Sequence, residues 1–450
     1  MLLTIAAFLF VLSIVILVHE LGHFLVAKMN GIYVITFSMG FGPKILKFKW
    51  GETEYAISAL PFGGYVKFAG EDADEGGKKD GEEKVDDLDI PEHRLYRNKN
   101  PYQRMSVVLA GPVMNAVLAL LLYIFNIWGQ GIFVREPDSI ISGVVAGSPA
   151  EEAGLLRGDR VIEINDHGLD KDSQIRDLVV YEEGVRSTFK ILRGEETLTF
   201  SIVPRWDEEA ERLTLGIFSS GPARIGDVKR DSPAEEAGLK RGAEIIAIND
   251  TLVYTYIEVA EKIYSHNGIP LKFTWRQDEE FLSAMITPTG MDAPSQGEKL
   301  DVVQVGAIGV GEYYDKVPVS FSESVVYGTR AFNNLFMAII DFLGKLVTGK
   351  ATLRAVGGPI RVGVMAGDMI RWGFSYLINF LAFFSMNLAI FNLLPILPFD
   401  GGHFVLFLLE GTTGVKPSPK VQNVMLQIGF YILIALMAFI LFLDIFNLMR

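Results

Sequence analysis

The sequence contains no cysteine. Disulfide bonds and thiolate zinc sites are therefore excluded, and any bound metal ion must be held by histidine, aspartate or glutamate. Histidine is itself scarce, with six among 450 residues. Basic residues are also too few to balance the acidic ones, and the formal net charge is −13. This charge argues against nucleic acid as a partner, because a phosphate backbone attracts a basic surface.

Charged residues are nearly absent from four apolar stretches, each of which can cross a bilayer as a helix of roughly 20 residues. The stretches are Leu2–Ala27, Met105–Trp128, Tyr376–Leu397 and Val424–Leu448. The first lacks a basic leading region and a small-residue cleavage site, so we interpret it as a retained span and not as a signal peptide. The predicted fold class is a multi-pass α-helical membrane protein with four transmembrane helices.

Lysine and arginine near the ends of these spans predict their orientation. Basic residues are concentrated between the first two spans, so we expect residues 28–104 in the cytoplasm and residues 129–375 on the outer side. Five basic residues shortly before the third span act against this orientation, namely Lys345, Lys350, Arg354, Arg361 and Arg371.

An internal repeat lies between the second and third spans. Residues Ser148–Asp166 recur as Ser232–Asp250, and 14 of the 19 positions are identical at an offset of 84. Each copy has the pattern of a short helix, a glycine stop and an alternating strand. The pattern resembles the PDZ domain of bacterial envelope proteases, so we expect two inserted, β-rich α+β PDZ domains, at 131–220 and 221–312.

PDZ domains bind extended peptides at a sheet edge, so peptide ligands are one expectation for this region. The other is that the two domains are spacers or size filters without a ligand. Residues Leu215-Gly216-Ile217 resemble a carboxylate-binding loop, which we assign to the second domain.

The remaining connecting regions differ in composition. Residues 31–102 contain alternating, glycine-rich segments that predict short β-hairpins against the membrane. Within them, the acidic segment 71–89 has the composition of a solvated loop, and we give it no role. Residues 313–372 contain an expected amphipathic helix at Ala331–Val347, followed by a linker.

The first span carries His19-Glu20-Leu21-Gly22-His23, an H-E-x-x-H motif. On a helix, positions i and i+4 share a face, so both imidazoles can bind one zinc ion while Glu20 acts as the general base on the attacking water. Ionisable groups inside a membrane are costly and indicate function. The alternative is that these residues satisfy each other at the end of the helix.

A catalytic zinc site usually has three protein ligands and one open position. The segment from Asn392 to His403 contains two prolines and two glycines that must interrupt a helix at membrane depth. Such a break is tolerated only where it is buried in protein or lines a wet cavity. Asp400 is therefore the best third ligand, although it can also cap the next helix. His403 is the second candidate, and Asp341, Asp368 and Asp444 lie in less suitable contexts.

The first-span H-E-x-x-H, together with the late N-x-x-P-x-x-P-x-D-G-G motif at 392–402, resembles the site-2 protease family of intramembrane metalloproteases. The tandem PDZ domains narrow the resemblance to its Gram-negative inner-membrane branch. The resemblance implies that Asp400 is the third ligand of a Zn²⁺ ion and that the active site lies toward the cytoplasm. Residues Gly111-Pro112-Val113-Met114-Asn115 match the second-span G-P-x-x-N motif of the family. We expect substrate contacts from Asn392, Asn115, Gly63 and Gly64.

The domain order expected from these motifs starts with a first transmembrane helix at 1–30, the cytoplasmic loop at 31–102 and a second helix at 103–130. After the PDZ pair and the 313–372 region, we expect the third transmembrane segment at 373–410 and the fourth at 411–450. The chain would reside in the bacterial inner membrane, with the PDZ domains in the periplasm.

The resemblance implies a zinc endopeptidase that cuts transmembrane segments of single-pass proteins already trimmed outside the membrane. Its substrates would be an anti-sigma factor of the envelope stress response and, in a wider role, signal-peptide remnants. One alternative is a membrane adaptor or chaperone with a vestigial metal site. A second is a membrane-anchored protease with a soluble catalytic domain, but His93, His167 and His266 stand singly and form no second H-E-x-x-H.

Overall fold

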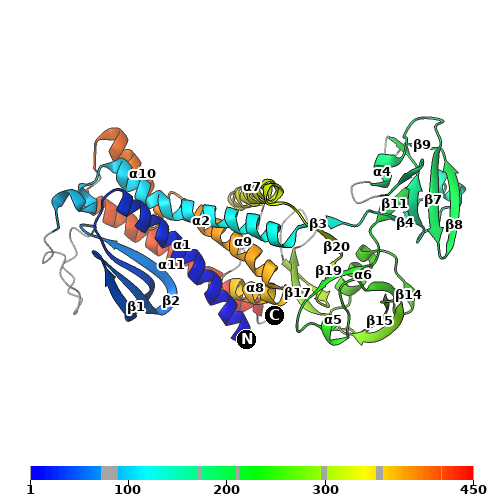
Figure 1. Cartoon of the computed structure of the whole chain (residues 1–450), viewed down its shortest axis with the longest axis horizontal. Coiled ribbons are helices and arrows are strands. Elements are labelled where there is room, and N and C mark those ends of the chain that lie inside the picture. The colour runs from blue at the N-terminus through cyan, green and yellow to red at the C-terminus, as the bar shows by residue number, and fades with distance from the viewer. Residues whose placement is uncertain are drawn as a thin grey trace. The chain divides into compact units, whose positions relative to one another are not determined.

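The computed structural model describes residues 2–71, 90–169, 174–208, 212–294, 302–350, 358–416 and 418–448. Most of the acidic segment 71–89 lies outside these residues. The chain forms two compact units, which are considered separately (Figure 1). The membrane unit contains Met1–Gln130 and Val319–Arg450, and the inserted unit contains Gly131–Gly297 and Val302–Pro318.

Among the described residues of the membrane unit, four helices are long and apolar enough to cross a bilayer. They are α1 (Leu2–Met29), α2 (Pro101–Gln130), α9 (Phe374–Asn392) and α11 (Pro419–Leu448). The prediction of a four-span α-helical membrane protein is thereby confirmed. The third span differs from its expected extent, because α9 ends at Asn392 and α10 (Asp400–Thr413) begins only after a non-helical segment. Pro395 and Pro398 lie in this interruption, as their chemistry requires. The expectation that Gly401 and Gly402 also interrupt the helix is wrong, because both lie in the first turn of α10.

Two apolar clusters hold the helices of this unit together. One joins α1, α9 and α8 (Pro359–Trp372), and the other joins α2, α9 and α7 (Phe321–Val347). Helix α7 begins ten residues before the expected Ala331. Its first turn is closed by a capping box in which Ser320 and Glu323 exchange hydrogen bonds between side chain and backbone.

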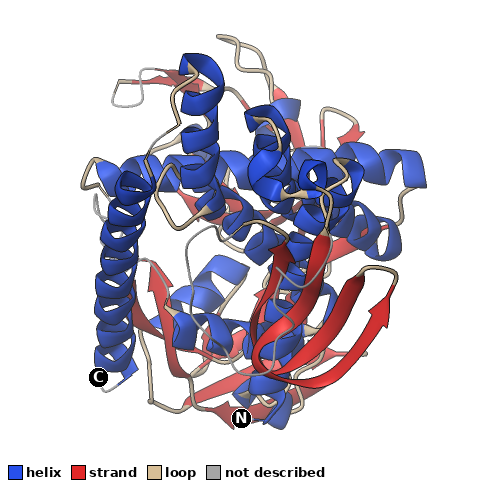
Figure 2. Cartoon of the chain, turned by 90° about the vertical axis from the view of Figure 1, so that its left-hand side faces the viewer, coloured by secondary structure: helices blue, strands red, loops and turns tan. Residues whose placement is uncertain are grey.

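The predicted β-hairpins between the first two spans form one curved sheet beside α1 (Figures 1 and 2). It is built from β1 (Val34–Trp50) and β2 (Thr53–Phe68), and each strand bends so that it contributes twice. Residues 34–39 pair with 54–57 on one side and with 64–68 on the other, while 44–50 pair with 53–58. Residues 64–68 therefore form an edge of the sheet, since no described strand pairs with their other side.

The opposite edge, residues 44–50, exposes large apolar side chains between its lysines. They are Ile45, Leu46, Phe48 and Trp50, each more than half exposed. Such an exposed apolar surface indicates contact with lipid or another apolar partner.

Glu52, in the turn at the end of this edge, forms ion pairs with Lys28 of α1 and with Arg94. The two terminal guanidinium nitrogens of Arg94 each lie 2.8 Å from a carboxylate oxygen of Glu52. Partial burial acts to raise the pKa of Glu52, but hydrogen bonds from Arg94 and Lys28 outweigh it and hold this pKa below its ordinary value. Arg94 belongs to the first of two short 3₁₀ turns, η2 (Glu92–Arg94) and η3 (Tyr96–Asn98), that lead into α2.

The inserted unit contains two modules, each with its own apolar core. The first module comprises β4 (Ile140–Val144), α3 (Pro149–Glu152), β5 (Arg160–Ile164), β6 (His167–Gly168), α4 (Ile175–Leu178), β7 (Ser187–Arg193), β8 (Glu196–Ile202), β9 (Arg205–Asp207), β10 (Arg212–Thr214) and β11 (Ile217–Ser220). The second comprises β12 (Ile225–Val228), α5 (Pro233–Glu236), β13 (Glu244–Ile248), β14 (Thr251–Leu252), α6 (Tyr256–Tyr264), β15 (Leu271–Gln277), β16 (Glu280–Ile286), β17 (Thr289–Pro294), β18 (Val302–Ala307) and β19 (Val310–Glu312).

The assignment of Leu215-Gly216-Ile217 to the second module is wrong. Ala150 donates its N–H to the Leu215 carbonyl and Val145 donates to that of Gly216, so the loop closes the first module. The corresponding loop of the second module is Ile308-Gly309-Val310, where Ala234 and Lys229 make the same two hydrogen bonds. Each module thus takes its loop from its own C-terminal end.

The two ends of the inserted unit pair with each other. Strand β3 (Ile132–Arg135) forms an antiparallel ribbon with β20 (Tyr314–Val317). Arg135 extends this link through an ion pair to Glu312 at 2.9 Å. The backbone of Gly131 lies so close to Val317 that a Cβ there would come within 2.3 Å of the Val317 carbonyl oxygen. The chain therefore enters and leaves this unit at one place.

Candidate metal centre

Helix α1 places the two histidines of the H-E-x-x-H motif on one face. Their Nε2 atoms lie 3.2 Å apart, which follows from the i, i+4 spacing on a helix. Both side chains are largely buried, and the Nδ1 atom of His23 donates a hydrogen bond to the Val107 carbonyl of α2 at 2.8 Å. The Nε2 lone pair of His23 is therefore free to face the space beside His19.

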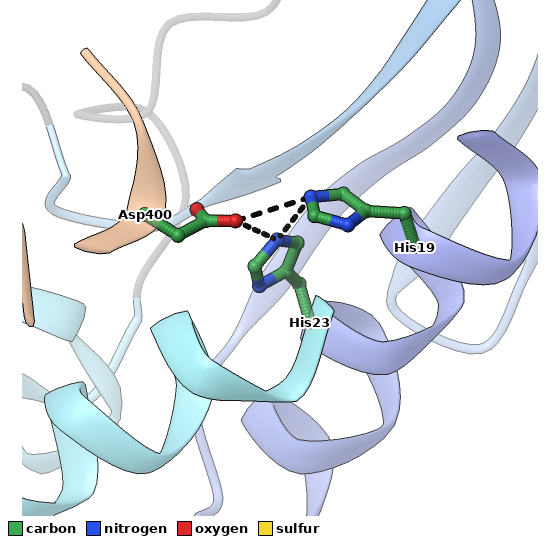
Figure 3. Close-up of side chains that lie close together, drawn as sticks. All are labelled: His19, His23 and Asp400. Atoms are coloured by element: carbon green, nitrogen blue, oxygen red, sulfur yellow. Dashed lines mark hydrogen bonds and ion pairs between the residues drawn. The ribbon is translucent and has the colours of Figure 1, made fainter. Parts of the chain in front are cut away.

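The third group at this place is Asp400, the first residue of α10, which follows the break after the third span. Its Oδ2 atom lies 3.2 Å from His19 Nε2 and 3.6 Å from His23 Nε2. Figure 3 shows the three side chains pointing toward one another from two separate elements. These separations match a tetrahedral zinc site, in which ligands about 2.1 Å from the ion lie about 3.4 Å apart.

The electrostatics of this arrangement favour a bound cation. Asp400 Oδ2 is buried and has no hydrogen-bond partner among the described residues. Two neutral imidazoles would direct their Nε2 lone pairs at the same carboxylate oxygen, so three electron-rich atoms would converge without a proton between them. Two nitrogens and one carboxylate oxygen are a ligand set that zinc accepts, and it leaves one position open.

No other group of three or more potential metal ligands lies this close together within the described part of the chain. His403, the second candidate for the third ligand, is outside the group. Its ring instead lies 6.5 Å from the ring of Phe407 on the same helix.

The structure also positions the other residues that the sequence singled out. A Cβ built on Gly64 would lie 3.1 Å from Cγ of Glu20, so the edge 64–68 of the sheet passes directly beside the expected general base. Gly63 has a φ of +117° and packs under the Phe41 ring. Asn392, the last residue of α9, places its amide nitrogen 3.4 Å from His19 Nε2. Asn115 lies on the opposite side of His19, beside Nδ1.

Sequence reasoning did not identify what Gly111 and Val107 do. A Cβ at Gly111 would lie 2.4 Å from Nε2 of His23 and 2.7 Å from Cε1 of His19, so only glycine lets α2 approach both imidazoles. The G-P-x-x-N match marked Gly111 as special but gave it no contact. The hydrogen bond from His23 to Val107 uses a backbone carbonyl, which leaves no signal in the sequence.

A family model described as "Peptidase family M50" matches residues 7–436. The chain belongs to peptidase family M50. It is a multi-pass membrane zinc metalloprotease, and the ligand set described above is consistent with the Zn²⁺ that this family implies.

Full-length relatives agree with this family. The chain is 29% identical to the regulator of sigma E protease of Salmonella typhi, over 98% of this chain and 97% of that protein. It is also 29% identical to protease RseP of Yersinia pestis, over 98% of each chain. A solved PDZ domain of an SdrC-like protein from Listeria monocytogenes is 21% identical, covers 21% of this chain and 85% of that one, and has a TM-score of 0.15.

The close approach of α2 to the ligands gives a prediction. We expect Gly111→Ala to weaken zinc binding by at least about tenfold, because the new methyl group must displace an imidazole and such disturbances around a ligand typically cost 10- to 100-fold in affinity. Zinc affinity would be measured on purified protein by competition with a chromogenic chelator. Gly129→Ala is the matched control, since a Cβ at Gly129 on the same helix meets nothing within 4 Å. Equal zinc affinity of the two variants would contradict the prediction.

Proposed function

We propose that this protein is an endopeptidase that hydrolyses peptide bonds within the transmembrane segments of single-pass proteins. The observation that carries the proposal is the location of the three ligands. His19 and His23 lie on the first span, and Asp400 follows the break after the third, so the ligands of one metal ion come from two hydrophobic segments. A peptidase site built in this way acts on chains within the membrane.

The chemistry follows from the groups that surround the open position. His19, His23 and Asp400 would hold the zinc ion, which would serve as a Lewis acid for the scissile carbonyl and lower the pKa of water toward ~7. Glu20 takes the proton of the attacking water as general base and returns it to the leaving amine. Asn392, whose amide lies 3.4 Å from His19 Nε2, holds the substrate backbone beside the ligands.

A substrate helix must unwind before its peptide bonds can be attacked, because its amides are hydrogen-bonded within the helix. The edge 64–68 of the sheet supports a solution. It has a free side among the described strands and passes next to Glu20. We propose that an unwound substrate adds to this edge as a further strand, which satisfies its backbone groups within the membrane. Gly64 then allows the substrate strand to come close to Glu20.

The proposed substrates are single-pass proteins that another protease has already trimmed outside the membrane. The name of the relative from Salmonella, a regulator of sigma E, supports an anti-sigma factor as one such substrate. Signal-peptide remnants, which are short membrane spans without a large outer domain, form a second class. The proposed location is the bacterial inner membrane, with the active site toward the cytoplasm and the inserted unit in the periplasm. In this orientation the PDZ-like modules exclude untrimmed outer domains. Any peptide that the modules bind comes from the periplasm.

The catalytic assignment is tested with a trimmed single-pass reporter in membranes. We expect Glu20→Gln to abolish its cleavage while zinc remains bound, since the substitution removes the general base and leaves the three ligands. A zinc chelator should abolish cleavage by the unmodified protein. Cleavage and zinc content are measured on the same membranes. Cleavage that persists unchanged in membranes with Glu20→Gln would not depend on this site, and it would favour the alternative of a membrane adaptor whose metal site has no catalytic role.

The edge-strand proposal predicts the effect of a proline. The N–H of Ala69 binds the Tyr33 carbonyl, so strand alternation places the N–H of Val66 on the free side of the edge. Val66→Pro should therefore reduce reporter turnover by about tenfold or more while zinc stays bound, because proline removes one donor to the added strand. Val66→Thr keeps this N–H and serves as the control. Unchanged turnover in Val66→Pro would count against strand addition.

If the PDZ-like modules exclude untrimmed outer domains, their removal should widen the range of substrates that the protein cleaves. Deletion of residues 140–310 removes both module cores and leaves the two strands of the β3–β20 ribbon. We expect the shortened protein to cleave an untrimmed single-pass protein that the full chain leaves intact, with trimmed reporter as the positive control. Loss of cleavage of both would indicate that the modules deliver substrate instead of excluding it.

A further inference from the structure

His19 has two ring nitrogens with different surroundings. Nε2 faces Asp400 Oδ2 and His23 Nε2, both at 3.2 Å, so it is the atom that faces the metal position. A neutral imidazole has one lone pair and one N–H, so a zinc-binding Nε2 requires that Nδ1 carries the proton. The neighbour of Nδ1 must then accept a hydrogen bond.

That neighbour is the side-chain amide of Asn115 on α2, which is fully buried. Its nitrogen Nδ2 lies 3.3 Å from His19 Nδ1, while its oxygen Oδ1 is buried without a hydrogen-bond partner among the described residues. The oxygen and nitrogen of an amide are distinguished by their partners. Since a zinc-binding Nε2 leaves the proton on Nδ1, we turn this amide by half a rotation, so that Oδ1 accepts the N–H of His19 and Nδ2 takes the place of Oδ1.

The other histidine has the same kind of support from the same helix. His23 donates from Nδ1 to the Val107 carbonyl at 2.8 Å. Val107, Gly111 and Asn115 are spaced by four residues and therefore share one face of α2. Acceptors thus lie one turn before and one turn after the glycine that both imidazoles contact.

The backbone at Asn115 is itself held by the third span. Ser385 on α9 is fully buried, and its hydroxyl donates to the Asn115 carbonyl at 2.8 Å. A buried asparagine and serine in adjacent membrane helices are costly unless their polar groups are used. Here the serine fixes the helix that carries the asparagine, and the asparagine reaches the zinc ligand.

We propose that Asn115 is a positioning residue that accepts the Nδ1–H of His19 through Oδ1, and so fixes the tautomer and ring orientation in which Nε2 binds zinc. This role replaces a direct substrate contact at Asn115. It rests on the assignment of the zinc ligands and does not depend on which proteins the enzyme cleaves.

Zinc affinity of the purified full-length chain, measured without substrate by chelator competition, tests the proposal. Asn115→Leu, which has a similar volume and no acceptor, should weaken zinc binding by about 10- to 100-fold. Asn115→Asp keeps an oxygen at this position and should stay within about threefold of the unmodified protein, because a carboxylate is an equally good partner for a zinc-binding histidine. If the leucine variant is not recovered folded, Asn115→Ala carries the same expectation.

Asn126→Leu is the matched control, because it removes another asparagine of α2, one that hydrogen-bonds to Asn379 at 2.8 Å. Its zinc affinity should not change. The proposal is overturned if Asn115→Leu binds zinc normally, if Asn115→Asp is as weak as Asn115→Leu, or if Asn126→Leu is equally weak. A normal zinc affinity together with a raised KM for the reporter would show that Asn115 contacts the substrate instead. Because zinc binding is read without cleavage, failure of the proposed function leaves this test valid.

Discussion

Three electron-rich atoms directed at one point inside a membrane protein constrain the rest of this structure. Two imidazole nitrogens and a carboxylate oxygen repel one another unless a cation lies between them, and lipid offers no water to separate them. The second span provides the geometry that makes the cluster possible. Gly111 leaves room for both imidazole rings. The neighbouring turns of α2 place the Val107 carbonyl beside Nδ1 of His23 and the Asn115 amide beside Nδ1 of His19. The broken third span then supplies the charge that the two rings lack.

The same break determines where the third ligand lies. A continuous helix from α9 into α10 would bury all its amides in its own hydrogen bonds and would keep Asp400 on a helix flank. The interruption after Asn392 instead makes Asp400 the first residue of α10, where a carboxylate is favoured by the helix dipole. The break of the helix and the position of the third ligand thus have one structural cause.

Some of this could be predicted from the sequence and some could not. The four spans and the pairing of His19 with His23 are local consequences of hydropathy and helical spacing. Asp400 required the family motif, because nothing local distinguishes a ligand from a helix cap. The contacts of Gly111 and Val107 depend on how α2 packs on α1, which one sequence does not reveal. The start of α7 was also predictable, because Ser320 and Glu323 have the S-x-x-E spacing of the capping box that begins this helix. The loop at Leu215 was misassigned because each module takes a structural segment from its C-terminal end, beyond the repeated stretch.

The ribbon of β3 and β20 has a consequence for how such a chain can diversify. A unit whose first and last strands pair behaves as a cassette, since its content can lengthen or shorten while its two attachment points stay together. The internal repeat within it, at an offset of 84 residues, has the form of a tandem duplication. Relatives could gain, lose or exchange modules at this position without altering the spans that carry the ligands. The inserted modules and the hydrolytic site can therefore evolve at separate rates.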